Sequence, residues 1–443
     1  MNASVANETY DLIGIGFGPS NLSVAIQAKE LGFFDKSKIQ FLEKKDKFSW
    51  HPDMLLPNSY MQIHFLKDLI SLDNPQSKYT FINFLKTNDR LLDFINQGIS
   101  YPTRIEFNQY MRWVASDFDD FVRYSTYVKD IRPIIIDGKI DSFRLTVVGT
   151  DDSSYEIVSR NVILASGKSK KIPREFTNLK SKDQNVIHSS GFLSWIEKCK
   201  EKLDNKILSV IGGGQSAGEI FSYLLSETSN STKIINYIST YGYNPSDSSG
   251  FNNKLFDPEF IDFFYDLDKE SQKEFLSRHK NTNYAVVEPE LIENIYRSLY
   301  NENKVEGKNR AKIVNMFRIV SVKEEQDGFI LSIINTMTKE ISKQYVDIIV
   351  LATGYEDNFV LDKYFYNFKG LAKLDAYGKP IINRNYSVNF KIESEATLYL
   401  QGYAEESHGL AESLLSVLPV RAKIILDHIY KGKLSECNLQ KSN

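Results

Sequence analysis

The sequence predicts an α/β protein with two dinucleotide-binding Rossmann-like domains, the first of which is split by the second. A strand, a glycine turn and a helix open the chain, and the same pattern recurs about 200 residues later. Two further apolar strands, at 162–164 and 348–351, end in small residues that let a backbone approach a ligand closely. We expect one part of the split domain at 1–170, the inserted domain at 171–345 and the remainder at 346–443.

Composition is that of an ordinary globular protein. Of the 443 residues, 42% are hydrophobic and 25% charged, and the net charge of -3 favours neither nucleic acid nor an anionic membrane as a partner. Cys199 and Cys437 form no CxxC pair and no zinc-ligand spacing, so we expect no disulfide framework and no metal. The N-terminus lacks a signal-peptide pattern, and no apolar run is long enough to span a membrane. We therefore expect a soluble, cytoplasmic protein.

The first glycine turn has the context of a pyrophosphate-binding loop. An apolar strand at 10–15 precedes it, a helix at 21–31 follows, and a strand at 39–42 completes the unit. Such a site needs a tight turn, a bare backbone against the phosphates and a helix N-terminus aimed at their charge. The motif is a variant, since Pro19 stands where GxGxxG has its third glycine. The residues predicted to bind the cofactor, including an acid for the ribose, are Gly14, Gly16, Gly18, Pro19, Ser20 and Glu43.

The second glycine turn has the same context. A strand at 206–211 precedes it and a helix at 217–225 follows, and the loop has the permitted GxGxxA form. The next strand leads into Ser239, with neither an acid for a free ribose nor an arginine for a 2′-phosphate, so this motif leaves NADPH and NADH both open. The residues predicted to bind the coenzyme are Gly212, Gly214, Gln215 and Ser216.

Longer segments stand in a fixed order along the chain: DLIGIGFGPSNLSVA, FSWHPDMLLPNSYMQIHFLKDLISLDNPQSKYTFINFL, YPTRIEFNQYMRWVA, VIGGGQSAGEIF, NTNYAVVEPELI, LATGYE and HGLAESLLSVLPVRA. With these segments, nearly the whole chain resembles the flavin-dependent N-hydroxylating monooxygenases of siderophore biosynthesis, the ornithine and lysine N-monooxygenases, and it is closest to the ornithine branch. The resemblance implies FAD and NADPH, with NADH as an alternative, O2, and a small primary amine whose neutral form attacks a flavin C4a-hydroperoxide. It also implies a homo-oligomer, a dimer or a tetramer.

The resemblance assigns roles to single residues as well. Gln62 and Arg104 would lie near the isoalloxazine ring, and Asn283 would hold substrate and coenzyme, so these three are the predicted catalytic residues. The predicted substrate-binding residues are Lys67, Asn253, Asn283 and Ser416. The further predicted cofactor-binding residues are Trp50, His51, Met54, Gln62, Arg104, Val128, Tyr284, Gly354, Tyr355 and Leu415.

The chain departs from the family pattern at three places. Ornithine enzymes typically read DDSPFVNE where residues 247–254 read DSSGFNNK, and HGLSD where Ala411 and Glu412 replace the last two residues. Ser239 stands where an arginine is usual. Lys67, which would pair with an amino-acid carboxylate, is kept. The substrate is therefore expected to be ornithine or a related amine without the carboxylate, such as putrescine or histamine.

Two other classes of protein compete with this interpretation. Another two-dinucleotide flavoenzyme is the first, but a disulfide reductase needs a redox cysteine pair, and a Baeyer–Villiger or general flavin monooxygenase usually carries FxGxxxH. The candidate histidine, His188, has Gln184 where that fingerprint requires glycine. The second is a flavin-binding protein without turnover, against which the retained lysine, asparagines and loops argue.

Overall fold

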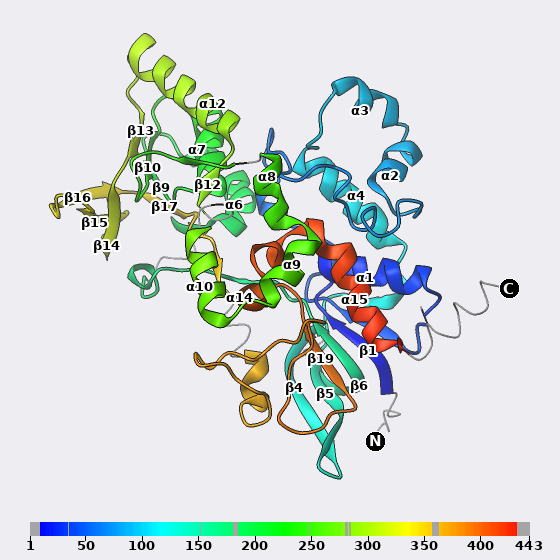
Figure 1. Ribbon diagram of the computed structural model, residues 1–443. Coiled ribbons are helices and arrows are strands. Elements are labelled where there is room, and N and C mark those ends of the chain that lie inside the picture. Colours follow the sequence, from blue (N-terminus) through cyan, green and yellow to red (C-terminus); the bar gives the residue numbers. More distant parts are fainter. Residues whose placement is uncertain are drawn as a thin grey trace.

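The computed structural model describes residues 9–33, 35–150, 152–179, 185–247, 249–279, 282, 285–356 and 363–431. Two sheets organise these residues (Figure 1). We call the parts of the chain packed around the larger sheet the first domain, and those around the smaller sheet the inserted domain. Among the described residues, no helix combines the length and apolar character needed to cross a membrane.

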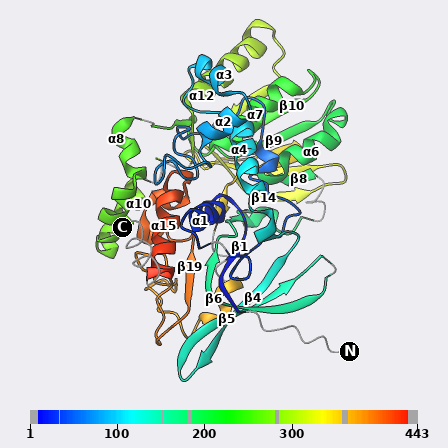
Figure 2. The same ribbon diagram turned by 90° about the vertical axis from the view of Figure 1, so that its right-hand side faces the viewer.

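The seven-stranded sheet of the first domain has the order β3-β2-β1-β6-β5-β4, and β19 also pairs with β6. Its strands are β1 (Thr9–Ile15), β2 (Ile39–Leu42), β3 (Val122–Arg123), β4 (Tyr127–Ile136), β5 (Lys139–Val148), β6 (Ser154–Leu164) and β19 (Thr397–Leu400). The pairs around β1 are parallel, whereas β4, β5 and β6 form an antiparallel meander. The helices α1 (Pro19–Glu30) and α15 (Leu418–Ile429), from opposite ends of the chain, lie side by side against the sheet (Figures 1 and 2).

The five-stranded sheet of the inserted domain is entirely parallel, in the order β13-β10-β9-β17-β8. Its strands are β8 (Val186–His188), β9 (Ile207–Ile211), β10 (Lys233–Tyr237), β13 (Ala311–Val314) and β17 (Ile348–Leu351). An antiparallel sheet of β14 (Phe317–Glu324), β15 (Phe329–Asn335) and β16 (Ile341–Val346) is attached to it. Buried strands such as β17 are wholly apolar because both faces of a parallel sheet are covered.

The chain enters and leaves the inserted domain at one place. The short strands β7 (Ser169–Lys170) and β18 (Tyr355–Glu356) pair antiparallel there. The expected boundary at residue 346 falls before β17, which pairs with β8 and β9. That boundary must therefore move to the far side of Leu351, because sheet pairing, which the local sequence does not reveal, assigns β17 to the inserted domain.

Helices complete both domains. In the first domain α2 (Phe81–Thr87), α3 (Leu91–Gln97) and α4 (Arg104–Ser116) form the group at the upper right of Figure 1, packed through Phe81, Phe107 and Tyr110. Further helices and strands of the described residues are α6 (Phe192–Cys199), α7 (Gln215–Glu227), α8 (Gly250–Asn253), α9 (Pro258–Tyr265), α10 (Lys269–Arg278), α12 (Pro289–Tyr300), α14 (Glu405–His408), β11 (Asn244–Pro245) and β12 (Val286–Val287). Short single-turn helices include η1 (Pro52–Met54), η6 (Lys254–Phe256), η9 (Leu410–Ser413) and η10 (Leu415–Val417).

Candidate functional site

The first glycine loop follows β1, and packing dictates its glycines. A Cβ on Gly14 would lie 2.3 Å from Cδ1 of Phe41, and one on Gly16 would lie 2.6 Å from the carbonyl oxygen of Ala165. Gly16 also has φ +83°, which a side chain would strain. Gly18 differs, because a Cβ there would point into open space. The loop is thus tight on the protein side and open at the helix end.

Both predicted loops end in a helix N-terminus without a side-chain cap. Gly18 is the N-cap of α1 and Gly214 is the N-cap of α7, and neither helix has a capping side chain or an acidic residue in its first turn. Uncapped N–H groups and the helix dipole favour an anion at such an end. The two loops therefore fit the pyrophosphates of two dinucleotides, as expected for FAD and a nicotinamide coenzyme.

Glu43 braces the first loop. One carboxylate oxygen accepts a hydrogen bond from the backbone N of Phe17 at 2.7 Å, and the other accepts from the N of Lys45 at 3.0 Å. The carboxyl group is buried but retains lone pairs that ribose hydroxyls could use. The acid predicted from its place after β2 therefore stands next to the loop.

The second loop packs closely against Ala352, the residue that follows β17. Gly212 has φ +144°, and a Cβ there would lie 2.3 Å from the carbonyl oxygen of Ala352. Gln215 begins α7, but its side chain is occupied within the protein: Oε1 accepts from the N of Glu288 at 2.9 Å and Nε2 donates to Glu219 at 2.9 Å. What Gln215 offers a coenzyme is therefore its backbone N–H.

Arg104 lies at the boundary between the two domains. Its Nη1 lies 2.8 Å from Oε2 of Glu219, and its Nη2 lies 2.8 Å from Oε1, so the pair is bidentate. The side chains are 15% and 5% exposed, and bidentate pairs shielded from water are the strong ones. Burial raises the pKa of Glu219, and Arg104 opposes that rise. Burial first, and then the charge of Glu219, raises the pKa of Glu288 to about 7.

Lys67 forms a second long-range ion pair, with Asp257. Its Nζ lies 3.8 Å from Oδ1 of Asp257, and the side chains are 28% and 47% exposed. Asp257 is the N-cap residue of α9, yet its carboxylate accepts no capping hydrogen bond. Asn253 lies four residues earlier, at the end of α8. Sequence reasoning missed Asp257, since an Asp before Pro is also the ordinary signal for a helix start.

Ser416 lies in η10, which contacts η9, and η9 in turn packs against η6 next to Asp257. The Oγ of Ser416 is buried and has no hydrogen-bond partner among the described residues. A buried hydroxyl without a partner is costly, which is consistent with a ligand supplying one.

A buried network ties the first loop to the C-terminal helix. Arg421 donates from Nη2 to Oγ of Ser20 and from Nε to Oε1 of Gln401, both at 3.0 Å. Its Nη1 lies 2.8 Å from Oε2 of Glu412, whose Oε1 accepts from the N of Gly402 at 2.6 Å. Ser20 thus has a protein partner. Glu412, one of the departures from the family motif, is half of a fully buried ion pair.

The other predicted cofactor residues are spread around the boundary. The ring of Tyr355 lies 6.1 Å from that of His51, and Trp50 packs on Phe107. Met54 is buried in the core of the inserted domain, and Gln62 is exposed. Val128 is buried in β4, Gly354 precedes β18 with φ +79°, and Leu415 begins η10. Among the residues named in the sequence analysis, those outside the described parts of the chain include Asn283, Tyr284, Ser248, Gln184 and Cys437.

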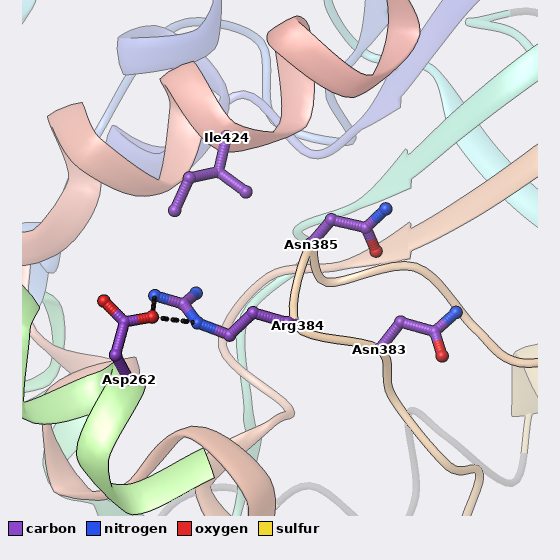
Figure 3. A pocket seen from close by; sticks show the side chains of 5 residues that line it. All are labelled: Asp262, Asn383, Arg384, Asn385 and Ile424. Atoms are coloured by element: carbon purple, nitrogen blue, oxygen red, sulfur yellow. Dashed lines mark hydrogen bonds and ion pairs between the residues drawn. The ribbon is translucent and has the colours of Figure 1, made fainter. Parts of the chain in front are cut away.

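A pocket of about 570 Å³ opens elsewhere (Figure 3). It is lined by Asp262, Asn383, Arg384, Asn385 and Ile424. Arg384 points at Asp262, with Nη2 2.6 Å from Oδ1. None of the predicted site residues that the structure describes lines this pocket. Within the described parts of the chain, no three His, Cys, Asp or Glu side chains gather as a metal site would require.

Two uncapped glycine loops, each following a parallel strand in one of the two main sheets, define an enzyme of the two-dinucleotide class when one domain is inserted in the other. Residues 8–357 match the model of the family described as L-lysine 6-monooxygenase/L-ornithine 5-monooxygenase. The chain belongs to this family of flavin-dependent amine N-monooxygenases, as the sequence predicted.

Similar proteins cover almost the whole chain. The L-ornithine N(5)-monooxygenase of Pseudomonas aeruginosa is 36% identical over 97% of this chain and 95% of its own length. The solved structure of an ornithine hydroxylase from the same organism has a TM-score of 0.87 at 35% identity, covering 96% of this chain and 99% of that one. The ornithine N-hydroxylase of Kutzneria sp. 744, solved with reduced FAD, NADP+ and L-ornithine, has a TM-score of 0.89 at 33% identity, covering 96% and 100%.

Proposed function

We propose that this enzyme uses FAD, NADPH and O2 to hydroxylate the side-chain amine of ornithine, for a hydroxamate siderophore. The observation that carries the choice of substrate is the pair of opposite charges formed by Lys67 and Asp257. An amino acid is a zwitterion, and its carboxylate and ammonium match such a pair. Putrescine and histamine lack the carboxylate and would leave Lys67 facing a cation. The ornithine bound by the Kutzneria relative supports the same choice.

The protein's own groups have limited tasks in this reaction. When bound, a reduced flavin with O2 supplies the electrophilic oxygen, so neither an acid–base pair nor a metal is required. The residues around Lys67 orient the amino acid, while water exclusion favours the neutral amine, whose ordinary pKa is near ~10.4. The buried Ser416 hydroxyl is available to a polar group of substrate or cofactor.

The nicotinamide coenzyme is proposed to be NADPH, on the strength of the relative that holds NADP+. Ser239 is exposed after β10 and offers no guanidinium to a 2′-phosphate. We therefore expect a weaker preference for NADPH over NADH than an arginine at this place would give, because a charge-assisted contact is absent. The ratio of kcat/KM for the two coenzymes measures it.

The deciding experiment measures hydroxylamine formation by the FAD-loaded protein. Ornithine, lysine, putrescine, cadaverine and histamine are compared with NADPH and with NADH. We expect hydroxylated ornithine as the main product. A higher kcat/KM for putrescine or histamine would overturn the substrate. Coenzyme oxidation that yields only peroxide with every amine would overturn the N-hydroxylase assignment and favour a flavin-binding protein without this turnover.

A further inference from the structure

A cluster of buried polar side chains joins the two domains beside the second glycine loop. Arg104 from the first domain meets Glu219 on α7, and Glu219 also accepts from Gln215 one helical turn earlier. Gln215 in turn contacts Glu288, just before α12. Four side chains from three elements therefore form one connected network.

The first-domain end of the network is tied to a predicted flavin segment. The backbone N of Arg104 donates to the carbonyl of Ser59 at 2.9 Å, and Thr103 forms a β-bridge with Tyr60. Gln62, predicted to lie near the isoalloxazine, follows two residues later. A displacement of Arg104 would consequently move the backbone of this segment.

The other end of the network lies at the start of α7, whose uncapped N-terminus is predicted to bind the coenzyme. Glu219 stands at i+4 from Gln215, so both face the same side of α7. Gly214, the open N-cap, directly precedes Gln215. The guanidinium of Arg104 is thus connected by one carboxylate to the turn that would hold the coenzyme's phosphates.

We propose that Glu219 is a positioning residue for hydride transfer between the two dinucleotides: its bidentate hold on Arg104 fixes the first turn of α7 relative to residues 59–62 of the first domain. The proposal rests on the proposed function only in taking both dinucleotides as bound. Its physical basis is that transfer rates fall steeply when reacting groups are displaced by about 1 Å. Glu219 itself touches neither reacting group.

Glu288 makes the pair of Arg104 and Glu219 sensitive to pH. The charged groups that act on it are Glu219 on α7, Arg104 on α4 and Glu290 on α12, and Arg104 also acts on His51. With Glu288 protonated, Glu219 faces Arg104 without a second carboxylate beside it. Because the pKa of Glu288 is raised to about 7, its ionisation as the pH rises through that value places a second negative charge beside the pair of Arg104 and Glu219, and we expect this charge to weaken the pair.

The test separates coenzyme binding from flavin reduction in Glu219→Gln, which keeps the size but loses the charge. We expect the coenzyme Kd to change less than about threefold, since the loop backbone is intact. The reduction rate at saturating NADPH should fall about tenfold or more. Without any cofactor, hydrogen exchange at the first turn of α7 should be faster. An unchanged reduction rate, or an effect confined to Kd, would overturn the proposal.

Two further variants serve as a control and as a test of the pH dependence. Glu227→Gln, at the other end of α7, breaks an exposed pair with Lys200 and should leave reduction unchanged. We expect the reduction rate of the wild-type protein to fall as the pH rises through 7, and Glu288→Gln should remove that fall. Persistence of that fall in Glu288→Gln would contradict the role given to Glu288. Failure of the wild-type flavin to accept electrons from either coenzyme would instead count against the proposed function.

Discussion

Two ion pairs join segments that are distant in the chain, and they differ in almost every respect. Arg104 and Glu219 form two contacts of 2.8 Å with little exposure to water. Lys67 and Asp257 form one contact of 3.8 Å and are about a third to a half exposed. Both carboxylate oxygens of Glu219 in the buried pair are bonded within the protein, whereas the open pair remains accessible to a ligand. We infer that the first serves architecture and the second recognition.

The difference also predicts how each pair responds to mutation. Removing one partner of a buried pair leaves an uncompensated charge, which costs several kcal/mol. Removing one partner of an exposed pair typically costs less than about 1 kcal/mol. Stability should therefore report on Arg104 and Glu219, and substrate kinetics on Lys67 and Asp257.

The largest effect is expected for Glu219→Ala. It strands the buried guanidinium of Arg104, and we expect the free energy of unfolding to fall by roughly 3–5 kcal/mol in urea denaturation. Glu227→Ala on the same helix removes an exposed partner of Lys200 and should cost less than about 1 kcal/mol. Equal losses in the two variants would erase the distinction between the pairs.

Lys67→Gln should come next, through substrate binding. Loss of a charge-assisted contact to the carboxylate, worth about 1.5–3 kcal/mol, should raise the KM for ornithine about 10- to 100-fold. The KM for putrescine should change little or fall. Lys78→Gln, which removes an exposed partner of Asp117, is the matched control. A parallel rise for both amines would mean that Lys67 does not contact the carboxylate.

A smaller effect concerns pH and Glu288. Its pKa is raised to about 7 from its ordinary value of 4.5, so between these values the folded protein binds a proton that the unfolded chain releases. This contribution to stability is complete below about 4.5 and is lost as pH rises through about 7. Glu288→Gln should consequently flatten the decline in Tm between these values. A slope identical to wild type would contradict the assignment.

The smallest change in stability is expected for Asp257→Asn, within about 1 kcal/mol. Its effect should appear in selectivity. The compound 5-aminopentanoate is ornithine without the α-ammonium. The kcat/KM for ornithine divided by that for 5-aminopentanoate therefore measures what the α-ammonium contributes. We expect the variant to lower this ratio, while Asp262→Asn on the same helix preserves it. An unchanged ratio in Asp257→Asn would show that its carboxylate does not face the ammonium.

The parts of the fold with local signals were predictable from the sequence. The strand expected at 10–15 is β1 (Thr9–Ile15), and the helix expected at 217–225 is α7 (Gln215–Glu227), which starts earlier because Gly214 is its N-cap. Hydrophobic periodicity and glycine turns are properties of neighbouring residues, so they are legible in a single chain. The membership of β17 depends on pairing with distant strands, and the boundary there was misplaced.

The candidate site divides in the same way. The two loops and Glu43 were found because each follows a strand at a fixed spacing. Glu219 lies inside a quoted motif, but its partner Arg104 is 115 residues away, and no spacing connects them. The resemblance named Arg104 and Lys67 without revealing which carboxylates they face. Such contacts depend on how the domains are docked, which local sequence does not encode.

The pairing of β7 with β18 places the two connections to the inserted domain next to each other. Adjacent strands in a sheet are only about 4.8 Å apart, so a linker of a few residues could join Lys170 to Tyr355 in place of everything between them. A shortened gene of that kind would encode the seven-stranded sheet with its helices and one glycine loop. Conversely, a single insertion between such neighbouring strands would add the second dinucleotide site to a protein with one site, without any rearrangement of its strand order.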